Sequence, residues 1–408
     1  MKAFIGSLGI TLGVLVCLSW VSFFREPPVQ VLCDSGAEIQ AVVCSLSSAR
    51  TSSLRNTALL TNIVNALPRD IQVIVLVKDL TAFKKNSPNQ RVKFIEVPND
   101  KGISIWPQDP FVVVSNGEQT RLIAPRVFER EDDEIMPVML GAKLSLEVVH
   151  SELCFEGGNI VCGEESVLIG YDTIALNAKL YETSFDDIES RFAELFGRPV
   201  ITVGTESQAI GHIDLVVTPL AGKKIAIADS RAGAVLARTA LQDAPGEIKQ
   251  FEQACESNFF GRADITELAD LSGKVIRRPQ IVEQTQVSIE ASVTAADSLD
   301  AIARQMTEGG LEVVRIPALV PDVTSKFNEE GKETPGFPFI TYNNVLLENR
   351  SQEKIVYLPQ YGCRPLDEAG AHCWTSLGYT VKTIKGFSTS AMYGGALRCC
   401  TKVLARKG

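Results

Sequence analysis

Short strand-like segments alternate with single helical segments along most of the chain, and this order limits the possible folds more than any other feature. Ile39–Leu46, Ile71–Val77 and Val92–Val97 are rich in β-branched residues, as strands are, and Ser53–Leu67 carries an apolar stripe with helical spacing. Similar ββαβ-like groups recur loosely further along. They lack the strict strand–helix alternation of a doubly wound sheet, so we predict an α/β fold of repeated small units.

Two later segments bear on the position of functional residues. Ile213–Thr218 and Ala396–Leu404 are predicted to be strands, because apolar and β-branched residues dominate both. Between the early and late units, residues 129–134 form an acidic run, which we predict to be a solvated loop. Attraction of a cationic substrate by this run is the less favoured interpretation.

The composition is typical of a globular protein with a large core, since 45% of the 408 residues are hydrophobic and 22% are charged. The length is sufficient for one large domain or roughly two to three ordinary ones. A net charge of −9 argues against non-specific binding of nucleic acid, which requires a basic face. An acidic protein suits a cationic substrate.

The N-terminal segment has a different character from the rest. Lys2 is followed by the 22 uncharged residues Ala3–Phe24, and Arg25 closes the run. A segment of this length can cross a bilayer as a helix, so residues 1–26 are predicted to be a signal anchor, with a cleaved signal peptide as the alternative. The remainder is then expected to be membrane-anchored or secreted.

Four polar clusters interrupt the apolar segments, and each follows or ends a strand-like segment. They are Trp106-Pro107-Gln108-Asp109-Pro110, Phe155-Glu156-Gly157-Gly158-Asn159, Gly211-His212-Ile213-Asp214 and Gly394-Gly395-Ala396-Leu397-Arg398-Cys399. Each has an ordinary structural explanation when taken alone, such as a turn aspartate or a satisfied core histidine. Together they supply a thiol, an imidazole and three carboxylates, a set suited to nucleophilic catalysis on a cationic group.

Cys399 is the candidate nucleophile, with a buried and inert cysteine in a final strand as the alternative. Its neighbour Arg398 is a cation of the kind that stabilises the reactive thiolate. His212 and Asp214 are two residues apart, so in a strand both point to the same face. None of the ten cysteines has the C-x-x-C spacing of a zinc site, and no metal is predicted.

This set of residues matches a planar cation. A guanidinium presents five N–H donors in a fixed fork, which carboxylates accept well. Two carboxylates would hold it while the thiolate attacks its central carbon. The histidine would donate a proton to the leaving amine and later take one from water.

The motifs resemble those of the guanidino-group-modifying superfamily, which has the pentein fold, and above all its agmatine deiminase and peptidyl-arginine deiminase branches. The first three clusters resemble Trp-x-(Arg/Gln)-Asp, Glu-Gly-Gly and Gly-His-(Ile/Val)-Asp. Val356-Tyr357-Leu358-Pro359-Gln360-Tyr361-Gly362 is similar to the Val-Pro-Gln-Phe-Gly strand of the agmatine enzymes. Gly394–Thr401 is similar to Gly-Gly-x-(Ile/Leu)-His-Cys-x-Thr. The five motifs occur in the family's order over roughly residues 35–405.

The resemblance implies that residues 35–408 form one pentein-type catalytic domain, a five-bladed α/β propeller of ββαβ units around a central active site. It implies Cys399 as nucleophile and His212 as general acid and base. Asp109 and Asp214 would act in catalysis and grip the guanidinium, and the substrate site would also include Glu156 and Trp106. No cofactor is implied, while calcium dependence and oligomeric state stay open.

The function expected from this resemblance is hydrolysis of peptidyl-arginine to peptidyl-citrulline and ammonia, through a covalent amidino thioether on Cys399. Arg398 replaces the family's usual histidine, and Gln108 stands where the agmatine enzymes usually have arginine. A predicted membrane segment is unusual for a metabolic agmatine enzyme and favours arginine in peptides as substrate. The alternatives are an agmatine or free-arginine deiminase, an amidinotransferase, or a membrane-tethered pentein protein that binds without catalysis.

Overall fold

The computed structural model describes residues 29–46, 50–78, 92–98, 102–127, 131–206, 211–261, 264–269, 275–278, 284–321 and 338–407. Within these ranges the chain forms five sheets of three or four strands and one two-stranded sheet. None of the helices in these ranges has the length and apolar character needed to cross a bilayer. The predicted signal anchor or signal peptide at 1–26 lies outside the described residues.

The five larger sheets share one plan, in which an antiparallel pair of strands is followed by a helical connection and a parallel strand. In the first, β5 (Val112–Ser115) and β6 (Thr120–Ala124) form a hairpin, and α4 (Ile135–Leu144) leads to β7 (Glu147–His150), parallel to β6. Because β7 runs parallel to β6, the chain needs the helix as a crossover. The ββαβ order expected from the sequence is therefore confirmed.

Three further units repeat this plan with longer helical connections. Their elements, in chain order, are β8 (Ile160–Cys162), β9 (Val167–Gly170), α5 (Tyr171–Tyr181), α6 (Phe185–Phe196) and β10 (Val200–Val203); β11 (Val217–Pro219), β12 (Lys224–Asp229), α7 (Ser230–Asp243), α8 (Pro245–Phe260), α9 (Gln284–Glu308) and β15 (Glu312–Leu319); and β17 (Leu346–Arg350), β18 (Glu353–Gln360), α10 (Arg364–Ser376) and β19 (Thr380–Lys385).

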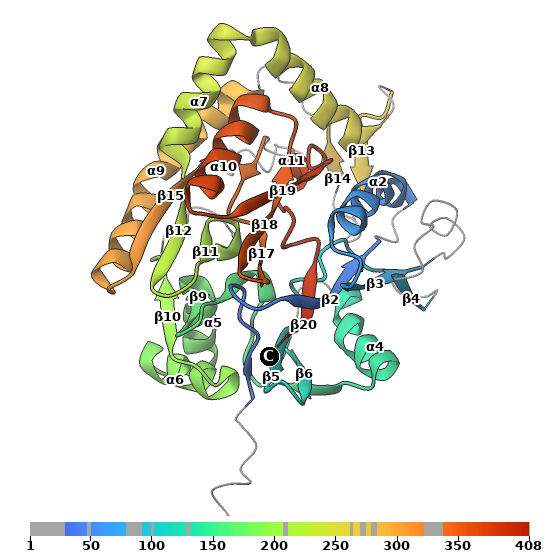
Figure 1. Cartoon of the computed structure of the whole chain (residues 1–408), viewed down its shortest axis with the longest axis vertical. Helices are drawn as coiled ribbons and strands as arrows, with labels where there is room; N and C mark the ends of the chain where they lie inside the picture. The colour runs from blue at the N-terminus through green and yellow to red at the C-terminus, as the bar shows by residue number, and fades with distance from the viewer. Residues whose placement is uncertain are drawn as a thin grey trace, which may run out of the picture.

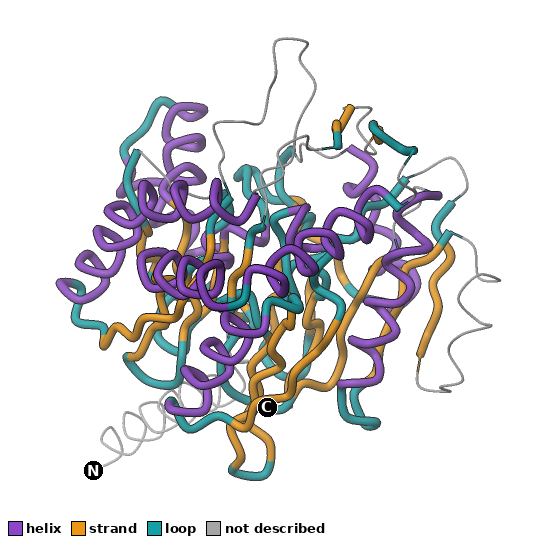
Figure 2. The backbone as a smooth tube through the Cα atoms, turned by 90° about the horizontal axis from the view of Figure 1, so that it is seen from above, coloured by secondary structure: helices purple, strands orange, loops and turns teal. Residues whose placement is uncertain are grey.

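The fifth unit joins segments from opposite ends of the sequence. β20 (Lys402–Arg406) pairs antiparallel with β2 (Ile39–Ser45), and α2 (Arg50–Ala66) connects β2 to the parallel strand β3 (Gln72–Val77). Figure 1 shows red β20 beside blue β2, with α2, α4, α6 and α9 toward the periphery. Seen from above, helices flank the strands, and the C-terminus lies at a strand-rich edge (Figure 2).

Short elements complete the described chain. They are β1 (Gln30–Val31) on β5, β4 (Val92–Glu96) on β3, β16 (Ile340–Thr341) on β15, the pair β13 (Glu267–Ala269) and β14 (Val275–Arg277), helix α11 (Ser390–Tyr393), and the 3₁₀ turns η1 (Glu131–Glu134), η2 (Gly157–Asn159) and η3 (Ile213–Leu215).

The packing of the core explains why the strand sequences are continuous apolar runs rather than alternations of apolar and polar residues. Val73 and Val75 of β3 belong to one buried cluster, whereas Ile74 and Leu76 belong to another on the opposite face. A strand buried on both faces carries apolar residues at successive positions. β3 is thus covered on both of its faces.

The prediction of a solvated loop at residues 129–134 is wrong for Asp133, whereas residues 129 and 130 lie outside the described residues. Asp133 lies in η1 and is 1% exposed. Its carboxylate accepts hydrogen bonds from the backbone N–H of Ser104 at 2.7 Å and from the Ser104 hydroxyl at 2.6 Å. These bonds satisfy a buried carboxylate that would otherwise be costly. They also fix the segment that leads into Trp106 and Asp109.

Candidate active site

Every one of the five units contributes to one site from the same position, the segment just before its first strand. Asp109 precedes β5, Glu156 precedes β8, Asp214 lies in η3 before β11, and Cys399 lies in a turn before β20. The remaining unit contributes Asn344, which precedes β17. Because the units share one plan, equivalent segments from different units meet at the same place.

Two predicted strands begin later than the sequence indicates. His212 precedes η3, whose 3₁₀ turn is closed by the N–H of Val216 on the carbonyl of Ile213 at 2.9 Å, so β11 begins only at Val217. The N–H of Ile213 donates to the Asn159 side chain at 3.1 Å, which holds the turn in place. Strand alternation is therefore the wrong reason for the proximity of His212 and Asp214.

The second late strand is β20, which begins at Lys402 rather than at Ala396. Cys399 lies in a turn, where the N–H of Cys400 donates to the carbonyl of Ala396 at 3.1 Å. The turn places the thiol beyond the end of the sheet. A strand would instead have placed it between the neighbouring strands. The predicted final strand is thus correct only for its last three residues, Lys402–Leu404, and wrong at Cys399.

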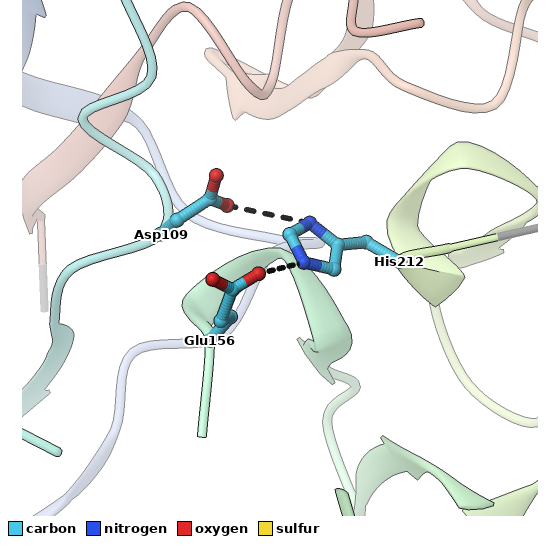
Figure 3. A group of neighbouring side chains, drawn as sticks. All are labelled: Asp109, Glu156 and His212. Atoms are coloured by element: carbon cyan, nitrogen blue, oxygen red, sulfur yellow. Dashed lines mark hydrogen bonds and ion pairs between the residues drawn. The ribbon is translucent and has the colours of Figure 1, made fainter. Parts of the chain in front are cut away.

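His212 lies between two carboxylates (Figure 3). Its Nδ1 is 3.5 Å from Oδ1 of Asp109, and its Nε2 is paired with Oε2 of Glu156. Burial alone would lower the pKa of His212, but the charges of Asp109 and Glu156 outweigh it and raise the pKa to about 9. At neutral pH the imidazole is therefore protonated and able to donate on both nitrogens.

Gly158 makes this arrangement possible. A Cβ on Gly158 would lie 2.4 Å from Nδ1 of His212 and 2.7 Å from Oδ1 of Asp109. Both contacts are shorter than any side chain tolerates. The second glycine of the Glu-Gly-Gly motif is therefore required by the close approach of the backbone to the imidazole.

Cys399 is buried among groups that both hold and restrain its thiol. Asn344 donates from Nδ2 to the sulfur at 3.2 Å and accepts the Cys399 N–H on Oδ1 at 3.1 Å. The thiol itself points to Oδ2 of Asp214 at 3.8 Å. Burial raises the pKa of Cys399 well above its ordinary value, and the charges of Asp214 and Asp109 raise it further. These effects favour the neutral thiol over the thiolate.

Arg398 acts on the site through Asp214. Its Nη1 donates to Oδ2 of Asp214 at 2.9 Å, and its Nε and Nη2 donate to the two oxygens of Asp34 at 3.2 and 3.0 Å. Oδ1 of Asp214 is buried and has no hydrogen-bond partner among the described residues. Asp214 therefore turns one anchored oxygen toward Arg398 and keeps the other available for a ligand.

Trp106 lies against the turn that carries the nucleophile. A Cβ on Gly395 would come within 2.5 Å of the Trp106 ring, so only glycine fits beneath the indole. The backbone N–H of Trp106 donates to the hydroxyl of Ser104 at 3.0 Å, which ties the indole to the buried Asp133 described above. The predicted substrate-binding tryptophan thus borders the Cys399 turn; its contact with substrate stays a prediction.

The side chains of Asp109, Glu156 and His212 could in principle hold a metal, because their ligand atoms lie within 4.8 Å of one another. A protonated imidazole has no free nitrogen lone pair to offer a metal. The raised pKa of His212 depends on the charges of the same two carboxylates, so it does not decide whether a metal binds. The prediction that no metal is bound stays untested.

Two residues of this arrangement were missed in the sequence. Asn344 belongs to the pair Asn343-Asn344, which interrupts an apolar run, and two adjacent amides in such a run are a signal of buried hydrogen bonding. Asp34 follows a short strand in the same way as the other site residues do. Neither lies in a motif that the resemblance covers.

Comparison with known proteins identifies a family. The family model of the Porphyromonas-type peptidyl-arginine deiminases matches residues 46–404. No curated protein sequence matches the chain.

Solved structures resemble the whole chain at low sequence identity. An agmatine deiminase of C. jejuni is 14% identical, with 93% of this chain and 96% of that one covered and a TM-score of 0.59. An agmatine deiminase of Enterococcus faecalis is 13% identical, with 93% of this chain and 96% of that one covered and a TM-score of 0.59. A candidate arginine deiminase of Porphyromonas gingivalis is 15% identical, with 92% of this chain and 98% of that one covered and a TM-score of 0.61. The chain therefore has the pentein fold expected from its motifs and belongs to the Porphyromonas-type peptidyl-arginine deiminase family, enzymes that act on the C–N bonds of guanidino groups.

Proposed function

We propose that the protein deiminates arginine side chains in peptides, giving peptidyl-citrulline and ammonia through a covalent intermediate on Cys399. The observation that carries this proposal is the buried Oδ1 of Asp214, which has no hydrogen-bond partner among the described residues, on a carboxylate whose Oδ2 lies 3.8 Å from the Cys399 sulfur. A buried acceptor without a partner favours a ligand that donates hydrogen bonds. A guanidinium supplies such donors together with a positive charge.

Binding of the guanidinium would activate the thiol. Asp214 and Asp109 raise the pKa of Cys399 while their charges are uncompensated. A cation held between them cancels this effect and favours the thiolate. The nucleophile would therefore form only when a substrate is in place, which limits reaction of the thiol with other electrophiles.

The thiolate then attacks the central guanidinium carbon, and His212 donates its proton to the leaving nitrogen, which departs as ammonia. Neutral His212 accepts a proton from water, and the resulting hydroxide attacks the amidino thioether. The carbon–sulfur bond breaks to give the ureido product and the thiolate, and the proton of the added hydroxyl is released to solvent, where ammonia takes it up. One water is consumed and one ammonia released, and His212 ends in its starting state.

Arginine within a peptide is the favoured substrate for two reasons. The family matched over residues 46–404 is described by peptidyl-arginine, and the side chains of His212 and Glu156 are 23% and 25% exposed, so the site opens to the surface. Agmatine is the second candidate, because the C. jejuni and E. faecalis structures that resemble this chain are agmatine deiminases.

Three substrates separate these candidates. Incubation with an arginine-containing peptide, agmatine and free arginine should release ammonia and ureido product fastest from the peptide. Product from agmatine alone would contradict the peptide proposal and support the second candidate. Transfer of the amidino group to an added amine, without ammonia, would instead indicate an amidinotransferase.

Labelling tests whether the site is catalytic at all. A haloacetamidine carries a cation that carboxylates bind and a carbon that a thiolate alkylates, so it should label Cys399 selectively. Cys399 left unlabelled in folded protein would favour a binding protein without catalysis. The Cys399→Ser variant is the matched control.

A further inference from the structure

A pair of cysteines lies directly behind the candidate site, where the segment after β1 runs beside β8. The N–H of Asp34 donates to the carbonyl of Cys162 at 2.8 Å, and the N–H of Cys162 donates to Oδ2 of Asp34 at 2.8 Å. These two bonds hold Cys33 against Cys162, and the Cys33 sulfur lies 3.5 Å from the Cys162 carbonyl oxygen.

The two thiols differ in reactivity. The side chain of Cys162 is the main cause that lowers the pKa of Cys33 to about 7, whereas the pKa of Cys162 is well above its ordinary value. Cys33 is half-buried and Cys162 is buried. The less buried thiol is thus the one that more readily becomes a thiolate, and Cys162 is the neighbouring thiol that would resolve a mixed disulfide.

Asp34 connects this pair to Asp214. Oδ2 of Asp34 accepts from both Cys162 and the Arg398 guanidinium, and Arg398 in turn donates to Asp214. A cavity of about 40 Å³ is lined by Cys33, Asp34, Cys162 and Arg398, among others. It gives these side chains room to rearrange without disturbing the packed core.

We propose that Cys33 and Cys162 form a reversible disulfide that controls the grip of Asp214 on the substrate guanidinium. A small disulfide such as oxidised glutathione supplies the oxidising equivalents. The Cys33 thiolate attacks it and releases one glutathione thiol. Cys162 then loses its proton and attacks the mixed disulfide, which releases the second thiol. Two protein thiols become one disulfide, and one glutathione disulfide becomes two thiols.

Closing the bond moves Asp34. The Cys33 sulfur, which as a thiol donates to the carbonyl of Ser35 at 2.8 Å, moves away from that carbonyl, and the peptide that joins Cys33 to Asp34 shifts with it. Arg398 then loses a carboxylate partner and holds Asp214 less firmly. A lost hydrogen bond to a charged group corresponds to roughly a tenfold rise in KM, with little change in kcat. This second effect rests on the proposed function, whereas formation of the disulfide does not.

Peptide mapping tests the disulfide without reference to activity. The full-length Cys399→Ser protein is treated with oxidised glutathione, alkylated and digested without reductant. A peptide that joins Cys33 to Cys162 is expected, while half-buried Cys373 stays alkylated and serves as the control. Cys33 and Cys162 recovered as separate alkylated peptides would overturn the proposal.

Kinetics test the connection to Asp214. Oxidation should raise the KM of the wild-type enzyme about tenfold, dithiothreitol should reverse the rise, and Cys33→Ser should show neither effect. If oxidation also raised the KM of Cys33→Ser, the proposal that the disulfide controls Asp214 would be overturned. Absence of turnover on every guanidino substrate would refute the proposed function, and the mapped disulfide would still decide this inference.

Discussion

The imidazole half and the thiol half of the site differ in their access to water. His212 and Glu156 have side chains that are 23% and 25% exposed, whereas Asp214 is fully buried and Cys399 is 5% exposed. Proton exchange with solvent is therefore possible at His212, and electrostatic interactions are strongest around Cys399, where water is excluded. The site separates the group that exchanges protons from the group that forms the covalent bond.

The largest expected effect is loss of the nucleophile. Cys399→Ser should lower kcat by a factor of about 10⁴ or more, because serine in this site has no base that makes it a comparable nucleophile. Stability should change by less than about 1 kcal/mol, since the replacement is nearly isosteric. Single-turnover kinetics and thermal unfolding measure the two quantities. Cys400→Ser is the matched control, and activity retained in Cys399→Ser would move the nucleophile to Cys400.

Asp214→Asn removes the charge that joins substrate and Arg398 in the buried half. We expect a rise in KM of roughly 10²- to 10³-fold, because an oriented charge pair with the guanidinium is lost. Stability should also fall by about 3 kcal/mol, since Arg398 remains buried with one fewer counter-charge. Denaturant titration measures this loss.

The control for Asp214→Asn is Asp300→Asn. Asp300 pairs with Arg231 and Arg315 at the surface, where such pairs contribute at most about 1 kcal/mol. Equal losses of stability in the two variants would contradict the distinction between a buried and an exposed pair.

Asn344→Ala tests how the thiol is held. The variant loses the hydrogen bond from the side chain to the Cys399 sulfur and the hydrogen bond that the backbone N–H of Cys399 donates to the side chain. We therefore expect kcat/KM to fall roughly 10- to 100-fold. Asn343→Ala also removes a buried amide, but one that bonds to Ala226 and Thr218 rather than to the thiol. It should affect stability more than catalysis. A similar loss of kcat in both variants would show that Asn344 has only a structural role.

The smallest expected effect is a shift of the pH profile from the imidazole half. Since His212 must be protonated to act as an acid, kcat/KM should fall above about pH 9. In Asp109→Asn this limb should move down by about one pH unit, because a carboxylate that raises the pKa is lost. NMR titration of the three histidines would assign the limb to His212. If the His212 resonance titrated at the same pH in wild type and in Asp109→Asn, the pairing of His212 with Asp109 would be contradicted.

The same pairing has a linked effect on stability. The pKa of His212 is raised from 6.5 to about 9, so the folded state binds the proton more tightly than the unfolded chain does. Its contribution to the free energy of unfolding is complete below about pH 6.5 and is lost as the pH rises through about 9. Thermal unfolding of wild type and Asp109→Asn across this range measures the difference.

The repeated units could be predicted from the sequence because their strands are dense in β-branched residues and their helices carry regular apolar stripes. The predicted strand Ile71–Val77 agrees with β3 (Gln72–Val77), and the predicted helix Ser53–Leu67 lies within one to three residues of the bounds of α2 (Arg50–Ala66).

The site was less predictable, because its geometry depends on contacts between units. His212 and Asp214 meet through a 3₁₀ turn held by Asn159, a residue from another unit, and no local pattern encodes that contact. Asp133 is acidic in sequence and buried in structure, because Ser104 satisfies its carboxylate from a distant segment. Motif resemblance identified the candidate residues but could not show that Arg398 turns toward Asp214.

The pairing of β20 with β2 has a consequence for biosynthesis. Ile39 leaves the ribosome well before its partner Arg406, because all the residues between them are made first. The turn that presents the sulfur cannot be fixed until this contact of very high sequence separation has formed, and such contacts form slowly. The inner units of a nascent chain should therefore fold first, and the chain should have no activity until β20 pairs with β2.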